Sequence, residues 1–378
     1  MANTNTTTQI VDTIFAKGLQ ALREMAVMPR YVNRGYDPAP GVKGSTVEVS
    51  VPVAMTANTV TPSYVAPDDA GVSPTKKVIT LDQWYEAPFF LNDKEVAEIR
   101  TGFENDQLTE AIRAVANNVD SAILALYTQI YNYGGTAGTT PFATNFDAFT
   151  EARAALARTL APKNPRYCVI NEDAEANALG LRPLQDLSFR GDQSTLREGE
   201  IGRVLGADWA MDQNIGSHTA GADLVGAVNE TGGVAVGTKS IAVDGLSAAF
   251  NTGDIFTIAG DAQTYVATAG CTTTLMNFEP GLQVAFPTAD GNQVITNKGN
   301  HVPNLLFHPD AFALAARPIE SGDPLAMAVD NRRAILDPVS GLSLTFEVTR
   351  QFYRTRFAFS TLYGVQCIRP ELAARIAG

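Results

Sequence analysis

The longest periodic segment of the sequence runs from Glu104 to Tyr133. Its apolar residues recur three or four positions apart, the spacing that gathers them on one face of an α-helix. They are Leu108, Ile112, Val115, Val119, Ile123, Leu126 and Ile130. Gly134 and Gly135 follow and are predicted to end the helix. Roughly 28 residues at about 1.5 Å each would span about 42 Å, longer than most helices of globular proteins.

An extended hairpin is predicted before this helix. Thr46–Val53 alternates valines with polar residues, and Pro52 marks the end of a strand or an edge strand. Lys76–Phe90 alternates again, and the Thr-, Pro- and Asp-rich Ala54–Thr75 between them is predicted to form a long tip. A two-stranded hairpin is marginal by itself, so we expect it to rest on another part of the fold. A long helix flanked by such a hairpin is unusual for a compact enzyme.

The N-terminal region carries a second helical pattern, from Ile10 to Met28, which Pro29 is expected to end. An amphipathic helix at a chain end must bury its apolar face. It can pack on its own domain, or it can lie as an arm on a neighbouring subunit. Periodicity does not choose between these alternatives.

Charge and cysteine content narrow the classes of protein. The 378 residues predict two or three domains, and the net charge of −12 disfavours binding that depends on neutralising nucleic-acid phosphates. Cys168, Cys271 and Cys367 are far apart, which favours a reducing compartment over disulfides or a zinc site. No Lys or Arg precedes Lys17, and no apolar run has the length of a membrane span. We therefore expect a soluble protein of the cytoplasm.

The middle of the chain alternates helical and extended patterns. Helices are predicted at Phe146–Thr159 and from Glu172, and strands at Tyr167–Asn171 and within Ile201–Gly216. Asn92 and Glu95 have the spacing of a capping box for a short helix.

The amino-acid composition changes at Val225. Val225–Lys298 has two basic and six acidic residues and is dense in Thr, Gly, Val and Ala. Its short alternating runs between turns predict an inserted all-β barrel or sandwich. After Pro338 the chain returns to strands, LSLTFEVT, FYRTRFAFS and YGVQCIRP.

The stretch NLLFHPDAFALAARP has the residue types of an active site, with His308, Asp310 and Arg317 close in sequence. Local physics favours a strand that stops at a Pro309–Asp310 turn, followed by a short apolar helix through Phe312 and Ala315. His308 then serves as a turn residue. A metal site of His218, His301 and His308 is disfavoured because no HxH or HExxH spacing is present.

Other polar groups have two interpretations each. Asp68–Asp69 and Glu172–Asp173 could be acid/base pairs, but a solvated tip and a helix N-terminus are more common settings. The C-terminal arginines could bridge to acidic neighbours or lie on a strand surface with ion pairs. They are Arg350, Arg354, Arg356, Arg369 and Arg375. No phosphate loop and no GxSxG motif occurs. We predict no catalytic, cofactor-binding or metal-binding residue.

The order of these elements resembles that of the major capsid protein of tailed bacteriophages, the Hong Kong ninety-seven type fold. The stretches GRVLGADWAMDQNI, NLLFHPDAFALAARP and LYGVQCIRPELAARI are the most similar to the family, and the inserted region resembles that of the P-twenty-two type coat proteins. The resemblance implies an α+β fold. Its expected parts are an N-terminal arm (1–35), an E-loop hairpin (36–90), a peripheral domain with the spine helix (91–145), an axial domain (146–224 and 299–341), an inserted β domain (225–298) and returning peripheral strands (342–378).

The resemblance also implies a function, which is self-assembly into the icosahedral shell around the double-stranded DNA of a tailed phage. The expected partners are further copies in pentamers and hexamers, a scaffolding protein and a portal, with no cofactor, no membrane and no sequence-specific DNA contact. The protein would be part of the virion and assemble in the bacterial cytoplasm. The candidate subunit contacts are Ile14, Phe15, Leu19, Leu22, Trp84 and Tyr85. The rival classes are a β-rich adhesin-like surface protein and a soluble α/β enzyme.

Overall fold

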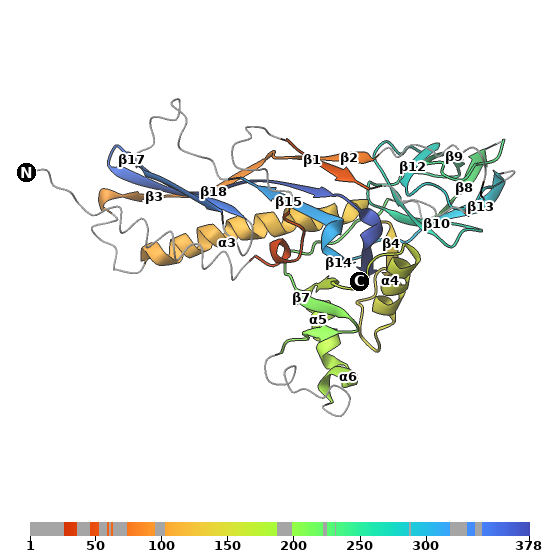
Figure 1. Ribbon diagram of the computed structural model, residues 1–378, viewed down its shortest axis with the longest axis horizontal. Helices are drawn as coiled ribbons and strands as arrows, with labels where there is room; N and C mark the ends of the chain where they lie inside the picture. Colours follow the sequence, from red (N-terminus) through yellow and green to blue (C-terminus); the bar gives the residue numbers. More distant parts are fainter. Residues whose placement is uncertain are drawn as a thin grey trace, which may run out of the picture.

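The structure, a computed structural model, describes a set of residue ranges separated by gaps. They are 26–35, 46–52, 59, 62, 74–94, 103–186, 199–221, 225–230, 232–286, 289–317, 331–336 and 342–378. The fold is α+β and elongated, with a long limb, a shorter limb that descends from it, and a barrel at the far end of the long limb (Figure 1). In the described ranges, no helix is both long and apolar enough to cross a membrane.

Helix α3 (Phe103–Leu124) runs along the long limb and packs on strands β3 (Gln83–Asn92) and β18 (Arg354–Cys367) (Figure 1). Its buried apolar residues follow the predicted stripe. They are Ile112, Val115, Ala116, Val119, Ile123 and Leu124. The apolar pattern is therefore confirmed for this part of the helix.

The predicted end of the long helix at Tyr133 is wrong. The helix ends at Leu124, a 3-10 turn η2 (Ala125–Gln129) follows, and the chain then forms strand β4 (Asn132–Gly135). Gly134 lies inside this strand instead of ending a helix, and a Cβ there would sit 2.5 Å from the backbone nitrogen of Ala152. The glycine allows helix α4 (Asp147–Arg158) to pack directly on the strand.

An antiparallel sheet covers α3. Its strands follow the order β15 (Phe312–Ala316), β18, β17 (Ser343–Gln351) and β16 (Asn331–Leu336), and β3 pairs with β18. The predicted helix through Phe312 and Ala315 is wrong, because this segment is β15, paired with β18 from Cys367 to Tyr363. FYRTRFAFS and YGVQCIRP are also not separate strands: β18 is one strand of 14 residues that spans most of both.

The descending limb is built on a six-stranded mixed sheet. The order is β4, β19 (Ala373–Ala377), β14 (Pro303–Phe307), β5 (Tyr167–Ile170), β7 (Ala207–Met211) and β6 (Arg203–Val204). Helices α4, α5 (Glu172–Gly180) and α6 (Arg182–Gln185) pack around it. Short 3-10 turns η3 (Pro309–Ala311) and η5 (Pro370–Leu372) precede β15 and β19. The predicted helices near 146 and 172 and the strand at 167 are confirmed. One hydrophobic core joins both limbs.

Six strands close a barrel of their own. They are β8 (Val225–Glu230), β9 (Ser240–Asp244), β10 (Ile255–Ile258), β11 (Thr264–Ala267), β12 (Leu275–Glu279) and β13 (Ala289–Asn297). The short alternating runs predicted as strands are strands. The barrel has a separate core, in which Phe256 contacts Tyr265 and Phe278 with ring centroids 5.7 Å apart in each pair.

Strands β1 (Thr46–Val51) and β2 (Thr75–Thr80) form a hairpin as predicted, and β1 ends just before Pro52. The predicted single strand Lys76–Phe90 is wrong, because it is divided between β2 and β3, and β3 pairs with β18 instead of β1. The apolar face of the hairpin is buried against residues of the long limb, as expected. The cluster contains Val49, Ile79, Leu81, Ala313, Ala315 and Ile368.

Several predictions fall in the gaps. Most of the Ala54–Thr75 tip, including Asp68 and Asp69, and most of the Ile10–Met28 helix lie outside the described residues. Met28 and Pro29 themselves belong to a 3-10 turn, η1 (Met28–Arg30). Asn92 is the last residue of β3, and Asp93 and Lys94 after it are helical as predicted, whereas Glu95 and the rest of that helix fall in a gap.

Candidate functional site

Two of the predicted subunit contacts, Trp84 and Tyr85, lie on strand β3 in the long limb. Trp84 is 67% exposed and Tyr85 is 44% exposed, and the Tyr85 ring contacts Tyr363 with centroids 6.3 Å apart. In the described part of the chain β3 pairs on one side only, with β18. An edge strand with large exposed aromatic side chains is suited to contact another protein. The other four candidates, Ile14, Phe15, Leu19 and Leu22, lie outside the described residues.

The turn between β17 and β18 presents two further aromatic residues. Phe352 is 89% exposed and Tyr353 is 66% exposed, and their ring centroids are 4.4 Å apart. Sequence reasoning missed this pair. The available signal was an aromatic pair at the tip of a hairpin, where polar residues and glycine are usual.

Four of the five C-terminal arginines make surface contacts. Arg350 pairs with Asp93, Arg356 with Glu86 at 2.6 Å, and Arg369 with Glu371 at 2.8 Å. The Arg354 guanidinium lies 4.7 Å from the centre of the Phe90 ring. Such exposed pairs typically contribute less than about 1 kcal/mol each, so they select local geometry more than they stabilise the fold.

Arg375 is different, because it is fully buried in β19 where the descending limb meets the barrel. Its Nη1 donates to the carbonyl oxygen of Gly253 at 2.7 Å, and its guanidinium lies 5.0 Å from the Tyr127 ring centre. Its Nε and Nη2 have no hydrogen-bond partner in the structure. Burial lowers the pKa of Arg375 to about 9.

Beside Arg375 a buried histidine connects a tyrosine and a carboxylate. The Nε2 of His218 lies 2.7 Å from Asp254 and its Nδ1 lies 3.0 Å from the Tyr127 hydroxyl. Burial would raise the pKa of Asp254, but hydrogen bonds from His218 and from the amides of Gly221 and Asn251 hold that pKa below its ordinary value. The carboxylate can only accept, so the geometry places the proton of a neutral His218 on Nε2.

His301 lies next to His218, with ring centroids 5.0 Å apart and a backbone bridge between the two residues. Its Nδ1 donates to the Gly299 carbonyl at 2.9 Å, and burial lowers its pKa to about 4. His308 is elsewhere: its Nδ1 accepts from the Asp310 amide at 3.3 Å, which is the predicted local turn bond. Two of the three histidines therefore meet, and the described ranges contain no group of three ligands suited to a metal ion.

Tyr127, His218 and Asp254 have the residue types of a proton relay. His218 is only 4% exposed and Asp254 is fully buried, however, so neither can reach a substrate. Their bonds connect η2 at the end of the long helix with the segments that enter the barrel. The arrangement therefore joins the barrel to the end of the long helix.

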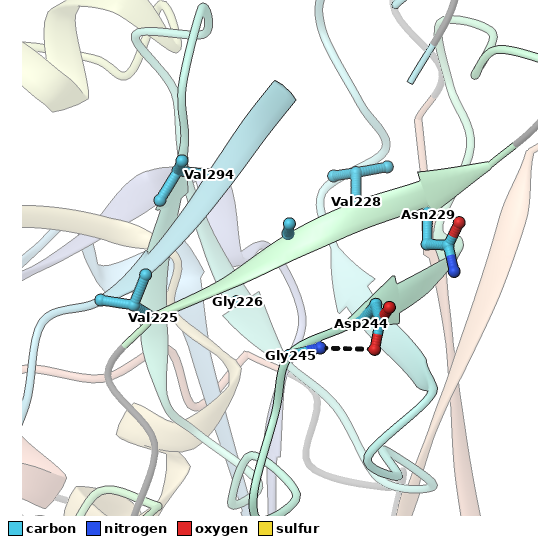
Figure 2. Close-up of a pocket in the computed structure, with 8 residues that line it drawn as sticks. Val225, Gly226, Val228, Asn229, Asp244, Gly245 and Val294 are labelled. Carbon is cyan, nitrogen blue, oxygen red and sulfur yellow. Dashed lines mark hydrogen bonds between the residues drawn. The ribbon is translucent and has the colours of Figure 1, made fainter. Parts of the chain in front are cut away.

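The barrel surface carries a hollow of about 630 Å³ between β8, β9 and β13. Figure 2 shows Val225 and Val294 at one end of the hollow and Asn229 and Asp244 at the other. Asp244 accepts from the amide of Gly245 at 2.7 Å. The lining offers one carboxylate, without a nucleophile or a second titratable group, so it is not equipped for catalysis.

The sequence matches no protein-family model and no curated protein. Solved structures do share its fold. Mycobacterium phage Che8 aligns at 18% identity with a TM-score of 0.50, over 93% of this chain and 90% of that chain. The capsid structure of the cyanophage P-SCSP1u aligns at 14% identity with a TM-score of 0.50, over 93% and 87%. The chain therefore has the tailed-phage major capsid protein fold.

Proposed function

We propose that this chain is a major capsid protein that self-assembles into the icosahedral shell of a tailed phage. The observation that supports this most is the shared fold, which extends over nearly the whole chain and over nearly the whole of a phage capsid protein. The exposed aromatic residues of β3 and of the β17–β18 turn are then contacts between subunits. An adhesin or an enzyme is not favoured, because neither accounts for a match of this extent.

In this proposal the elements take the parts of the capsid fold. Residues 1–35 are an arm, 36–90 an E-loop, 91–145 and 342–378 the peripheral domain, and 146–224 with 299–341 the axial domain. The hairpin packs on the long limb, and this observation supports the proposal that it is an E-loop extending from the peripheral domain. The arm and the hairpin tip are the elements that we expect to adapt when one chain occupies both rings of five and rings of six.

The barrel, residues 225–298, is an inserted domain in this proposal. Two observations support it: the barrel has its own core, and the chain enters and leaves it side by side, through the bridge between His218 and His301. Adjacent ends are what an insertion into a loop requires. The barrel would aid folding of the subunit or contact a neighbour. Replacing residues 225–298 by a short Gly-Ser linker tests both the folding role and the contact role. A soluble variant that still forms normal shells would contradict both.

The partners follow from this function. They are further copies in pentamers and hexamers, a scaffolding protein and a portal, with assembly in the cytoplasm of the bacterial host. The net charge of −12 suits a wall that encloses DNA without binding it tightly. We propose no cofactor and no catalytic role.

Sedimentation and negative-stain electron microscopy of the protein expressed alone test the proposed function. We expect closed shells or curved sheets. A protein that stays monomeric alone would be expressed again with the scaffolding gene from its own genome. Failure to form shells under both conditions would contradict the proposal.

A further inference from the structure

A small basic pocket lies at one end of the descending limb, where strands β5 and β7 begin, and it has room for about 10 Å³, no more than one water molecule. Its lining residues are Phe149, Arg153, Lys163, Arg166, Leu205, Gly206, Ala207 and Leu306. Three of them are cationic and none is acidic. A concentration of positive charge is unexpected in a chain with a net charge of −12.

Two of the three cationic side chains of this pocket are bonded to neutral groups. The buried Arg166 donates through Nε to the Pro162 carbonyl at 2.7 Å and through Nη2 to the Ala161 carbonyl at 2.9 Å. Arg153 donates to the Leu205 carbonyl at 2.7 Å. Carbonyls fix the side chains without neutralising them, so the pocket is preorganised for an anion.

Two exposed leucines have unusual backbone conformations: Leu205 lines the pocket, and Leu160 precedes Ala161, whose carbonyl oxygen binds Arg166. Leu160 has φ 58° and is 89% exposed just after α4, and Leu205 has φ 52° in the two-residue turn between β6 and β7. Glycine or asparagine is usual at both kinds of position, because a left-handed conformation is unfavourable for a bulky side chain. Neither exposed side chain gains much from packing within its own subunit. Their positions favour an apolar contact with another protein around the charged pocket.

The opposite end of the same strands is acidic. Because β5 and β7 are parallel, their C-terminal ends lie together, about 13 Å from the pocket for a four-residue strand. There α5 begins with Glu172 and Asp173, which are exposed, and with Glu175 one turn on. No salt bridge within the described ranges involves Glu172 or Asp173.

We propose that the basic surface around this pocket, with the exposed Arg153 and Lys163, contacts the acidic first turn of α5 in a second copy. Charge complementarity identifies the partner, because one chain carries both surfaces at opposite ends of one sheet. Such a contact is head-to-tail, and each copy can give and receive once. The inference rests on the proposed function in one respect, that copies of the chain contact one another.

Zero-length carbodiimide crosslinking tests the contact directly. Equal amounts of protein labelled with ¹⁴N and ¹⁵N are mixed as subunits, allowed to associate, crosslinked and digested. We expect mixed-isotope peptides that join Lys163 to Glu172 or Asp173. Absence of these peptides from the associated fraction, or a protein that remains monomeric, would overturn the proposal. So would protection of Lys163 by duplex DNA without a crosslink, which would indicate a phosphate site.

Charge reversal provides a second test. Arg153→Glu with Lys163→Glu, and separately Glu172→Lys with Asp173→Lys, should each raise the concentration needed for association about tenfold. The combined four-site variant should restore it, and Arg113→Glu with Lys239→Glu, on exposed surfaces of α3 and the barrel, is the charge-matched control. Circular dichroism checks that each variant is folded. Unchanged association of both pairs would overturn the proposal, as would failure of the folded four-site variant to recover.

The two proposals can fail separately. Closed shells without the crosslink would leave the capsid function intact and remove this contact. Oligomers that carry the crosslink but never close into shells would support the contact and contradict the capsid function.

Discussion

The backbone amide of Met28 donates a hydrogen bond of 3.1 Å to Asp120, a buried carboxylate 92 residues further along the chain. The amide of Val27 donates to the other carboxylate oxygen at 3.1 Å. Asp120 lies on the face of α3 that packs inside the fold. It therefore ties the segment that follows the N-terminal region to the long helix.

Asp120→Ala should weaken this tie. The substitution leaves two amides without a partner, at a cost of about 2 kcal/mol in the free energy of unfolding. Asp120→Asn is the matched control, because its one amide oxygen keeps part of the bonding. Urea unfolding and hydrogen exchange at Val27 and Met28 would measure both effects. Equal stability of the alanine variant and the original protein would show that the tie contributes nothing.

The same carboxylate predicts a pH dependence. Burial, with a smaller contribution from the negative charge of Asp212, raises the pKa of Asp120 from 3.8 to about 7. The folded state therefore holds this proton more tightly than the unfolded state between about pH 4 and 7. The contribution of Asp120 to stability should fall as the pH rises through that window. Asp120→Asn should flatten this component of the stability profile, and an unchanged slope would assign the dependence to other groups.

Arg375→Ala should destabilise the junction between barrel and limb by roughly 3–5 kcal/mol, because it empties a buried volume and leaves the Gly253 carbonyl unpaired. Arg375→Met should cost less, since it fills the space and removes a buried charge that has two unpartnered nitrogens. Denaturant unfolding compares the two variants. If Arg375→Met lowers the free energy of unfolding as much as Arg375→Ala, the charge itself is required and this explanation is wrong.

Gly364 allows the hairpin to rest on the long limb. A Cβ at this position would lie 2.2 Å from the Thr80 carbonyl oxygen, at the base of β2. Gly364→Ala should displace the hairpin and destabilise the protein by about 1–3 kcal/mol. Gly180→Ala is the control, because a Cβ there meets no atom within 4 Å. Thermal melting of both variants distinguishes a specific clash from a general effect of losing a glycine.

Trp84→Ala should leave the isolated subunit within about 0.5 kcal/mol of its original stability, because the side chain is mostly exposed. Association should weaken by about 2 kcal/mol or more if Trp84 is an anchor of a subunit interface. Sedimentation at several protein concentrations measures this, with Val236→Ala on the exposed barrel surface as the control. Association that is equally strong in both variants would exclude Trp84 from the contacts.

Much of the fold was predictable because it depends on local patterns. The stripe of α3, the helix α4 and the alternating strands of the barrel each bury one face, and a one-sided face leaves a period in the sequence. Turn chemistry was also local, so the Pro309–Asp310 turn and the bond from Asp310 to His308 followed from the residues themselves.

Two strands were predicted as parts of helices. Phe312–Ala316 and Asn132–Gly135 are short and lack a period, and strand pairing with β18 and β19 decides their conformation. Tertiary packing also explains why the burial of Arg375 was not predicted. Its charge placed Arg375 with the surface arginines, yet helix α4, the neighbouring strands and the segment of Gly253 all pack around β19.

The sequence by itself determined which segments are amphipathic, where turns fall and how the charge is distributed, because these properties depend on near neighbours in the chain. Only the tertiary structure decided which segments meet. It brought His218 to His301 and Met28 to Asp120, and it set the basic and acidic ends of one sheet opposite each other. Those contacts join residues far apart in the sequence, and their free energy depends on burial that no local pattern records.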